Sequence, residues 1–161
     1  MTATRQEIMD TVRRFVERAD EIAAGLSPAD WEKTTYEQGW TVKQAYCHLA
    51  SMGGAIPYFV NMAKNPPPGG GSGGAAFDVD AFNAMQVAQR QGKSTDEILT
   101  ELRTGFESSL KFLDGVSDEL LALEIDYPFV GGRGPLADLL VGTVTGHNDE
   151  HLDDVERAVR A

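Results

Sequence analysis

The sequence predicts an all-α protein that folds as an antiparallel four-helix bundle. Apolar residues recur every three or four positions along most of the chain, as on one face of an α-helix. The stretches that start at Thr41 and Ser94 begin with the pattern Ser/Thr-x-x-Glu/Gln, which is typical of a helix N-terminus. Hydrophobic residues make up 42% of the 161 positions, which is enough for a packed core. Since there is no internal repeat and no sign of a second domain, we expect one domain over residues 1–161.

The first half of the chain contains two predicted helices. The first covers residues 4–25, and its apolar face comprises Ile8, Val12, Phe15, Ala19, Ile22 and Leu26. The second covers residues 41–63 and begins with a capping box formed by Thr41 and Gln44. Pro57 lies inside this second stretch, so we expect a kink there.

A run of proline and glycine separates these helices from the next two. Residues 66–74 read PPPGGGSGG, which favours a flexible loop because neither a helix nor a strand tolerates that composition. A third helix is predicted over residues 78–91 and a fourth over residues 94–113, where the second capping box stands. The two segments could instead form one long helix that is broken at Gly92.

The last third of the chain ends in a long helix. A helical turn over residues 117–123, an extended segment over residues 124–129 and a glycine-rich turn over residues 131–135 come first. One extended segment does not make a sheet. The last helix is predicted to begin near Pro135 and to extend almost to Ala161.

The composition excludes several classes of function. Lys and Arg number 14 whereas Asp and Glu number 25, which gives a net charge of −11. This balance argues against nucleic-acid and anionic-membrane partners, since both require a basic surface. No apolar run reaches the ~18 residues of a membrane span, and the N-terminus lacks the basic and apolar regions of a secretory signal. We therefore expect a cytoplasmic protein.

The single cysteine, Cys47, excludes a disulfide framework. It lies about 100° around the predicted helix from His48, outside the apolar stripe. We therefore expect a surface or interface thiol that does not bind the same ion as its neighbour.

The chain has only three histidines, and their positions suit one metal ion. His147 and His151 are four residues apart in the last helix, which places both imidazoles on one face, about one turn apart. That face continues an apolar stripe, so the pair points into the bundle. His48 of the second helix can add a third ligand across the core. Three protein ligands leave a position open on the ion, as in catalytic metal sites.

Two acidic residues beside the histidine pair are candidate catalytic residues. Asp154 lies one turn beyond His151, and Glu150 precedes His151 directly. Either carboxylate could accept the second N–H of a histidine, act as a fourth ligand or serve as a general base. Either could equally pair with a basic side chain. The neighbours Asp149 and Asp153 are expected to face water.

Two segments of the chain resemble the signatures of the DinB-like proteins. Residues 39–50, GWTVKQAYCHLA, resemble the first signature, in which a Trp and a Ser/Thr helix start precede a His. Residues 147–155, HNDEHLDDV, resemble the terminal HxxxH signature. The resemblance implies a four-helix bundle, a homodimer and one divalent ion, zinc or nickel, bound by His48, His147 and His151.

The DinB-like proteins include the metal-binding domains of mycothiol-dependent maleylpyruvate isomerases and the bacillithiol and mycothiol S-transferases. The resemblance therefore implies a metal-dependent S-transferase that joins a low-molecular-weight thiol to a small electrophile. The alternatives are a metal-dependent hydrolase that uses activated water, a non-catalytic dimeric metal- or ligand-binding module, and a helical interaction protein with incidental histidines. Because the chain ends at Ala161 without the further domain of the full isomerases, we expect S-transfer in preference to isomerase activity.

Overall fold

The four-helix bundle predicted from the sequence is present in the computed structural model, which describes residues 2–66 and 78–161. The predicted loop over residues 66–74 therefore lies almost wholly outside the described residues. Among the helices within these two ranges, none is both long and apolar enough to span a membrane.

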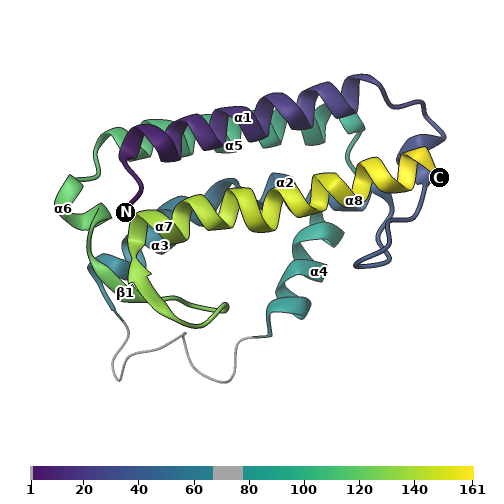
Figure 1. Ribbon diagram of the computed structural model, residues 1–161. Coiled ribbons are helices and arrows are strands. Elements are labelled where there is room, and N and C mark those ends of the chain that lie inside the picture. The colour runs from purple at the N-terminus through teal and green to yellow at the C-terminus, as the bar shows by residue number, and fades with distance from the viewer. Residues whose placement is uncertain (1, 67–77) are drawn as a thin grey trace.

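The bundle consists of two pairs of helices that run in opposite directions. Helices α1 (Arg5–Ala24) and α5 (Thr95–Asp114) lie side by side along one side of it. Helix α2 (Val42–Ser51) and the C-terminal helices α7 (Leu136–Gly142) and α8 (Asp149–Arg160) lie along the other side (Figure 1). The chain direction of α1 matches that of α8, and the direction of α2 matches that of α5. Each helix thus contacts an antiparallel neighbour, α1 with α5 and α2 with α8.

Both predicted capping boxes are confirmed, and they fix where two helices begin. The Thr41 hydroxyl accepts from the Gln44 backbone N–H at 3.1 Å, and the Gln44 side chain accepts from the Thr41 N–H at 2.9 Å. Ser94 and Glu97 make the same pair of bonds at the start of α5, at 3.2 and 2.7 Å. Each box satisfies two N–H groups that have no partner inside the helix.

The second predicted helix is interrupted, but not at the proline. It divides into α2, the 3-10 turn η2 (Met52–Gly54) and α3 (Ala55–Lys64). A Cβ on Gly53 would lie 2.9 Å from the Cα of Gly105 in α5, so the absence of side chains at both positions allows the backbones to touch. Pro57 stands in the first turn of α3, where a missing N–H costs little.

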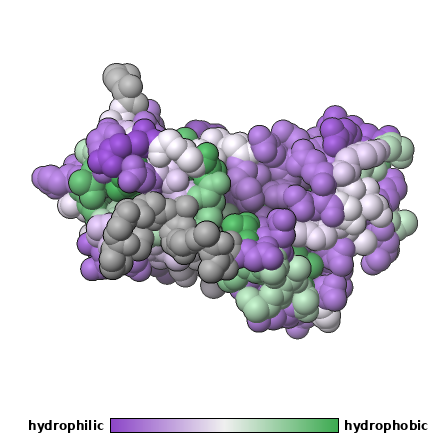
Figure 2. Space-filling model, turned by 90° about the horizontal axis from the view of Figure 1, so that it is seen from below, coloured by the Kyte–Doolittle hydropathy of each residue, from purple (hydrophilic) through white to green (hydrophobic). Residues whose placement is uncertain are grey.

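The third and fourth predicted helices are separate, so the alternative of one long helix broken at Gly92 is wrong. Helix α4 (Val79–Arg90) slants away from the bundle and contacts α2. Val87 is its one buried residue. Exposed apolar side chains are concentrated on α4 and in the region of the strands, at Val79, Phe82, Met85, Leu123, Phe129 and Val130. Figure 2 looks onto these elements from below and shows green patches among hydrophilic surface.

Two short strands correct the expectation of a single extended segment. After the short helix α6 (Asp118–Leu121), β1 (Glu124–Asp126) pairs antiparallel with β2 (Arg133–Pro135). The register places Ile125 opposite Gly134. Gly131 and Gly132, with φ angles of 76° and 90°, let the chain reverse between the strands. The segment expected to be only a turn therefore provides the second strand.

The last predicted helix is also divided, into α7, a π-helical segment η3 (Thr143–Asn148) and α8. The wider π-helical turn is a local feature that hydrophobic periodicity cannot detect. It carries His147 and thus lies at the candidate site.

The expectation that Cys47 is a surface or interface thiol is wrong: its side chain is fully buried. Helix α2 contacts α4, α5 and α8, so most of its circumference is covered. Burial raises the pKa of the Cys47 thiol to about 11.

Candidate metal centre

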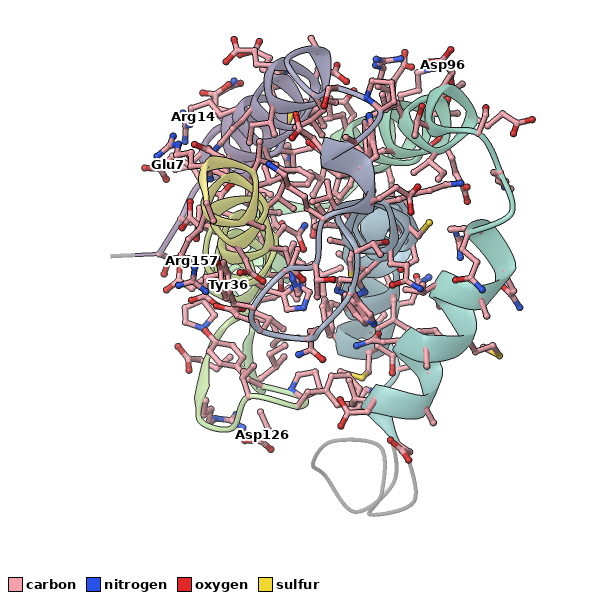
Figure 3. All side chains as sticks on the ribbon, turned by 90° about the vertical axis from the view of Figure 1, so that its right-hand side faces the viewer. Glu7, Arg14, Tyr36, Asp96, Asp126 and Arg157 are labelled. Carbon is pink, nitrogen blue, oxygen red and sulfur yellow. The ribbon has the colours of Figure 1, made fainter. Side chains whose placement is uncertain are left out.

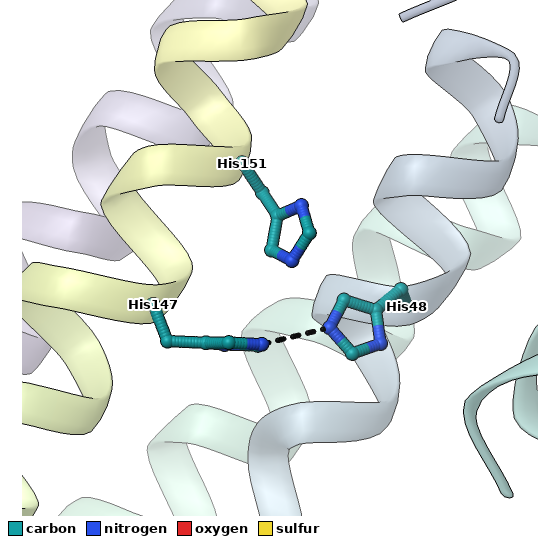
Figure 4. A group of neighbouring side chains, drawn as sticks. All are labelled: His48, His147 and His151. Atoms are coloured by element: carbon teal, nitrogen blue, oxygen red, sulfur yellow. Dashed lines mark hydrogen bonds between the residues drawn. The ribbon is translucent and has the colours of Figure 1, made fainter. Parts of the chain in front are cut away.

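The three histidines meet at one point between α2 and the C-terminal helices (Figure 4). One ligand nitrogen from each of His48, His147 and His151 can be chosen so that all three lie within 4.8 Å of one another. The ring centroids are 4.8–5.1 Å apart, and the ring planes cross at 71–80°. The imidazoles therefore converge edge to face and do not stack.

The closest approach in the cluster joins His48 and His147, whose Nε2 atoms lie 3.4 Å apart. Zinc–nitrogen bonds of about 2.0–2.1 Å at a tetrahedral angle place two ligand nitrogens about 3.3–3.4 Å apart. The observed separation fits a pair of ligands on one tetrahedral ion. The wider separations within the cluster require a further small inward movement of the rings.

Burial keeps two of the imidazoles neutral. His48 is 1% exposed and His151 is 8% exposed. This burial, reinforced by the neighbouring histidines, lowers the pKa of His48 to about 3 and that of His151 to about 4. Both side chains therefore have a free lone pair at neutral pH, as metal ligation demands. His147 is open to solvent, so it marks the accessible side of the site.

Asn148 orients His147, and sequence reasoning missed it. The two residues lie at the end of the π-helical segment, where Asn148 is 1% exposed. Its Oδ1 lies 2.9 Å from Nδ1 of His147 and accepts the proton of that nitrogen. This bond leaves the lone pair of His147 on Nε2, the atom that faces His48. The only sequence signal was an amide side chain directly after the first histidine of the HxxxH motif.

Trp40 covers two of the three histidine rings. Its ring centroid lies 5.1 Å from that of His48 and 5.9 Å from that of His151, nearly parallel to the latter at 28°. Trp40 directly precedes Thr41, the residue that caps α2, so the indole lies at the start of the helix that carries His48. The sequence contained this residue in its first signature but gave no reason to place it against the histidines.

Asp154 lies one turn after His151, but its hydrogen bonds go to residues other than the histidines. It is 4% exposed, and its charge acts on His151 to raise the pKa of that imidazole, against the dominant effect of burial. Its Oδ1 accepts from the Tyr36 N–H at 3.0 Å and from the Arg157 guanidinium at 3.1 Å. Its Oδ2 accepts from the Glu37 N–H at 3.0 Å.

The other acidic residues lie at the start of α8. Glu150 is exposed in the first turn of that helix, between the two histidines in sequence. Asp149 is half-buried and contacts Arg18 of α1 at 3.5 Å, contrary to the expectation that it faces water. Asp153 is mostly exposed and binds the same guanidinium at 2.5 Å. Arg18 thus ties the N-terminal helix to the helix that carries His151.

Comparison with known proteins identifies the family. The profile of the mycothiol maleylpyruvate isomerase N-terminal domain matches residues 12–142. The chain belongs to this family. The match confirms the predicted DinB-like membership; it includes His48 and ends before His147 and His151. None of the curated proteins matches the chain in sequence.

Solved structures share the fold of this mycothiol maleylpyruvate isomerase N-terminal domain protein. YfiT from Bacillus subtilis, described as "a probable metal-dependent hydrolase with an unusual four-helix bundle topology", is 14% identical with a TM-score of 0.69. The match covers 95% of this chain and 86% of YfiT. An uncharacterized protein from Clostridium difficile 630 is 10% identical with a TM-score of 0.74, covering 98% and 96% of the two chains.

The mycothiol-dependent maleylpyruvate isomerase itself is a longer protein. It is 13% identical to this chain, with a TM-score of 0.67. The match covers 97% of this chain but 61% of the isomerase. At this identity the similarity establishes the shared fold.

Proposed function

We propose that the protein binds one divalent ion, zinc or nickel, through His48, His147 and His151, and that it is a metal-dependent enzyme acting on small molecules. The observation that carries the proposal is the 3.4 Å separation of the His48 and His147 Nε2 atoms, which suits two ligands of one ion. The buried, neutral state of His48 and His151 supports it.

The residues around the histidines prepare the site for catalysis. When bound, a divalent ion with three protein ligands makes a thiol or a water molecule at its open position more acidic. Asn148 holds His147 with its Nε2 lone pair toward the site. Trp40 keeps water from one side of His48 and His151. Glu150 is exposed and directly precedes His151 in the sequence, and we propose that its carboxylate takes up the released proton as a general base.

The proposed reaction is S-transfer from a low-molecular-weight thiol. The sulfur forms a bond to an electrophilic carbon of the substrate while the bond from that carbon to its leaving group breaks. The leaving group departs with the bonding electrons, and the thiol proton passes to Glu150 or to solvent. Membership of the mycothiol maleylpyruvate isomerase N-terminal domain family supports a thiol as co-substrate. The thiol is therefore expected to be of the mycothiol or bacillithiol type.

Hydrolysis is the second candidate, supported by a different observation. YfiT, which shares the fold over 95% of this chain, is described as "a probable metal-dependent hydrolase". In this reaction a water molecule, not a thiol, attacks the carbonyl carbon of an ester or amide, and the same carboxylate takes up a proton from the water. The bond from that carbon to the alcohol or amine group breaks, and this leaving group receives the proton. The two candidates share the histidine site and differ in the nucleophile.

Two measurements on protein purified without a histidine tag test the proposal. Elemental analysis is expected to find close to one zinc or nickel per chain, and the variant with all three histidines replaced by Ala is expected to have none. Assays with electrophiles, with and without thiol, and with ester substrates then separate the candidates. Activity that requires thiol supports S-transfer, activity that ignores thiol supports hydrolysis, and metal binding without either activity supports a binding module. Equal metal content in the parent protein and the triple variant would overturn the proposal.

We further propose that the protein is a homodimer, as the resemblance implies, and that it is cytoplasmic, as expected from the sequence. Light scattering coupled to gel filtration is expected to give twice the mass of the chain. A monomeric mass across the micromolar range would contradict the dimer.

A further inference from the structure

The segment before α2 is a closed loop, which we call the strap and define as residues 33–41. Thr34 and Thr41 form an isolated antiparallel bridge, and the Val42 N–H donates to the Lys33 carbonyl at 2.8 Å. These contacts bring the two ends of the strap together, so its shape is fixed at the base.

Inside the strap, Thr35 holds Trp40. The backbone N–H of Thr35 donates to the Trp40 carbonyl at 2.7 Å, and the Thr35 hydroxyl donates to the same oxygen at 2.8 Å. Thr35 is 5% exposed, so both bonds are shielded from water. Gly39 has a φ of 68°, a conformation that glycine adopts without strain and that turns the chain back toward Trp40.

The tip of the strap is fixed to α8 by a buried carboxylate. Asp154 accepts the consecutive N–H groups of Tyr36 and Glu37, one on each oxygen, both at 3.0 Å. The Arg157 guanidinium bonds to Asp154 and lies 4.6 Å from the centre of the Tyr36 ring (Figure 3). Both oxygens of Asp154 are thus occupied by the strap and by Arg157.

We propose that Asp154 is a positioning residue, which acts through the strap to hold Trp40 against His48 and His151. The inference rests on the metal site put forward above. It gives Asp154 a role other than that of a general base, because both oxygens of its carboxylate already bond to the strap or to Arg157. One turn of α8 therefore carries both His151 and the residue that secures the cover over His151.

The two tryptophans of the chain allow a selective test. Trp31 lies in the core against Tyr46, with ring centroids 5.0 Å apart, whereas Trp40 lies against the histidines. In a Trp31→Phe background, Trp40 is the only indole and its fluorescence reports the strap. We would compare Asp154→Asn with Asp153→Asn in that background. The control makes the same chemical change one residue away, on a side chain that bonds to Arg18 and not to the strap.

The metal-free proteins are tested first. Acrylamide is expected to quench Trp40 at least twofold more efficiently in Asp154→Asn than in the Trp31→Phe parent, because the strap is released. Asp153→Asn is expected to match the parent. Thr35→Val, which removes only the hydroxyl bond to Trp40, is expected to shift quenching in the same direction with the fold intact by circular dichroism.

Nickel titration then links the strap to the site. Nickel is expected to quench Trp40 in the parent, and Asp154→Asn is expected to bind nickel about 10–100-fold more weakly, the range for residues that support ligands. Unchanged acrylamide quenching and unchanged nickel affinity in both Asp154→Asn and Thr35→Val would overturn the inference while the metal site stands. A parent protein that binds no nickel and no zinc would overturn the proposed function instead, and the acrylamide result would still decide whether Asp154 holds the strap.

Discussion

The Nε2 atoms of His48 and His147 lie 3.4 Å apart although 99 positions separate the two residues in the sequence. The contact exists because α2 packs against the C-terminal helices, so it is made only when the bundle is folded. An ion that binds both atoms therefore binds the folded state alone. Its binding free energy adds to the stability of the fold.

Metal removal is expected to destabilise the protein. A ligand at 100 times its Kd adds about 2.7 kcal/mol to the free energy of unfolding, if it does not bind the unfolded chain. Thermal melting with zinc and with a chelator measures the difference as a change in Tm. The protein with His48, His147 and His151 replaced by Ala is the control, since its Tm should not respond to either addition. Coincident melting curves for the parent protein would contradict the prediction.

Asn148→Ala is expected to weaken metal binding about 10–100-fold, since the hydrogen bond that orients His147 is lost. Asn148→Asp keeps an acceptor for the same N–H and is expected to retain more of the affinity. Calorimetric titration with zinc measures both. Thr145→Ala is the matched control, because Thr145 lies in the same π-helical segment but donates to the Val141 carbonyl and not to a histidine. A control variant that loses as much affinity as Asn148→Ala would refute the specific role of Asn148.

Gly53→Ala is expected to lower the free energy of unfolding by about 1–3 kcal/mol, the cost of overpacking a tight contact. The new methyl group would lie 2.9 Å from the backbone of Gly105, which cannot rotate away. Gly54→Ala is the control: a Cβ there has no atom within 4 Å, so the change is expected to be neutral or stabilising. Urea denaturation of the two variants gives the comparison. Equal denaturation midpoints for the two variants would show that the contact between η2 and α5 tolerates a side chain at position 53.

Cys47 is expected to resist thiol reagents in the folded protein. It is fully buried, and burial also holds its pKa at about 11, so the thiolate is scarce at pH 8. Labelling with a chromogenic disulfide should be slow in buffer and complete within minutes in guanidinium chloride. Rapid labelling of the native protein at pH 8 would mean that α2 opens readily.

The predictable parts of the fold were those with local signals. Thr41 with Gln44 and Ser94 with Glu97 mark helix starts because the cap bonds join residues three positions apart. The convergence of the three histidines was also predictable, since helical spacing and the resemblance both indicated it. The catalytic roles given to Glu150 and Asp154 stay predictions.

The remaining features depend on contacts between distant segments. The break at Gly53 depends on Gly105 in another helix, and the π-helical turn has no periodic signature. Cys47 was misplaced because a helical wheel assumes one covered face, whereas α2 is packed on several sides. The scarcity of charge in α2 after Lys43 was the neglected signal, since a helix that is apolar all round is an interior helix.

The π-helical turn η3 couples metal binding to the conformation of the backbone. A π turn is rarer and less favourable than an α turn, and this one carries the histidine most open to solvent. The three histidines come together while η3 is π-helical, so an ion bound by them favours the π form. By thermodynamic reciprocity, any change that favours the α form must weaken the binding of the ion. Metal affinity can thus be tuned by helix propensity over residues 143–146, without altering any of the three histidines.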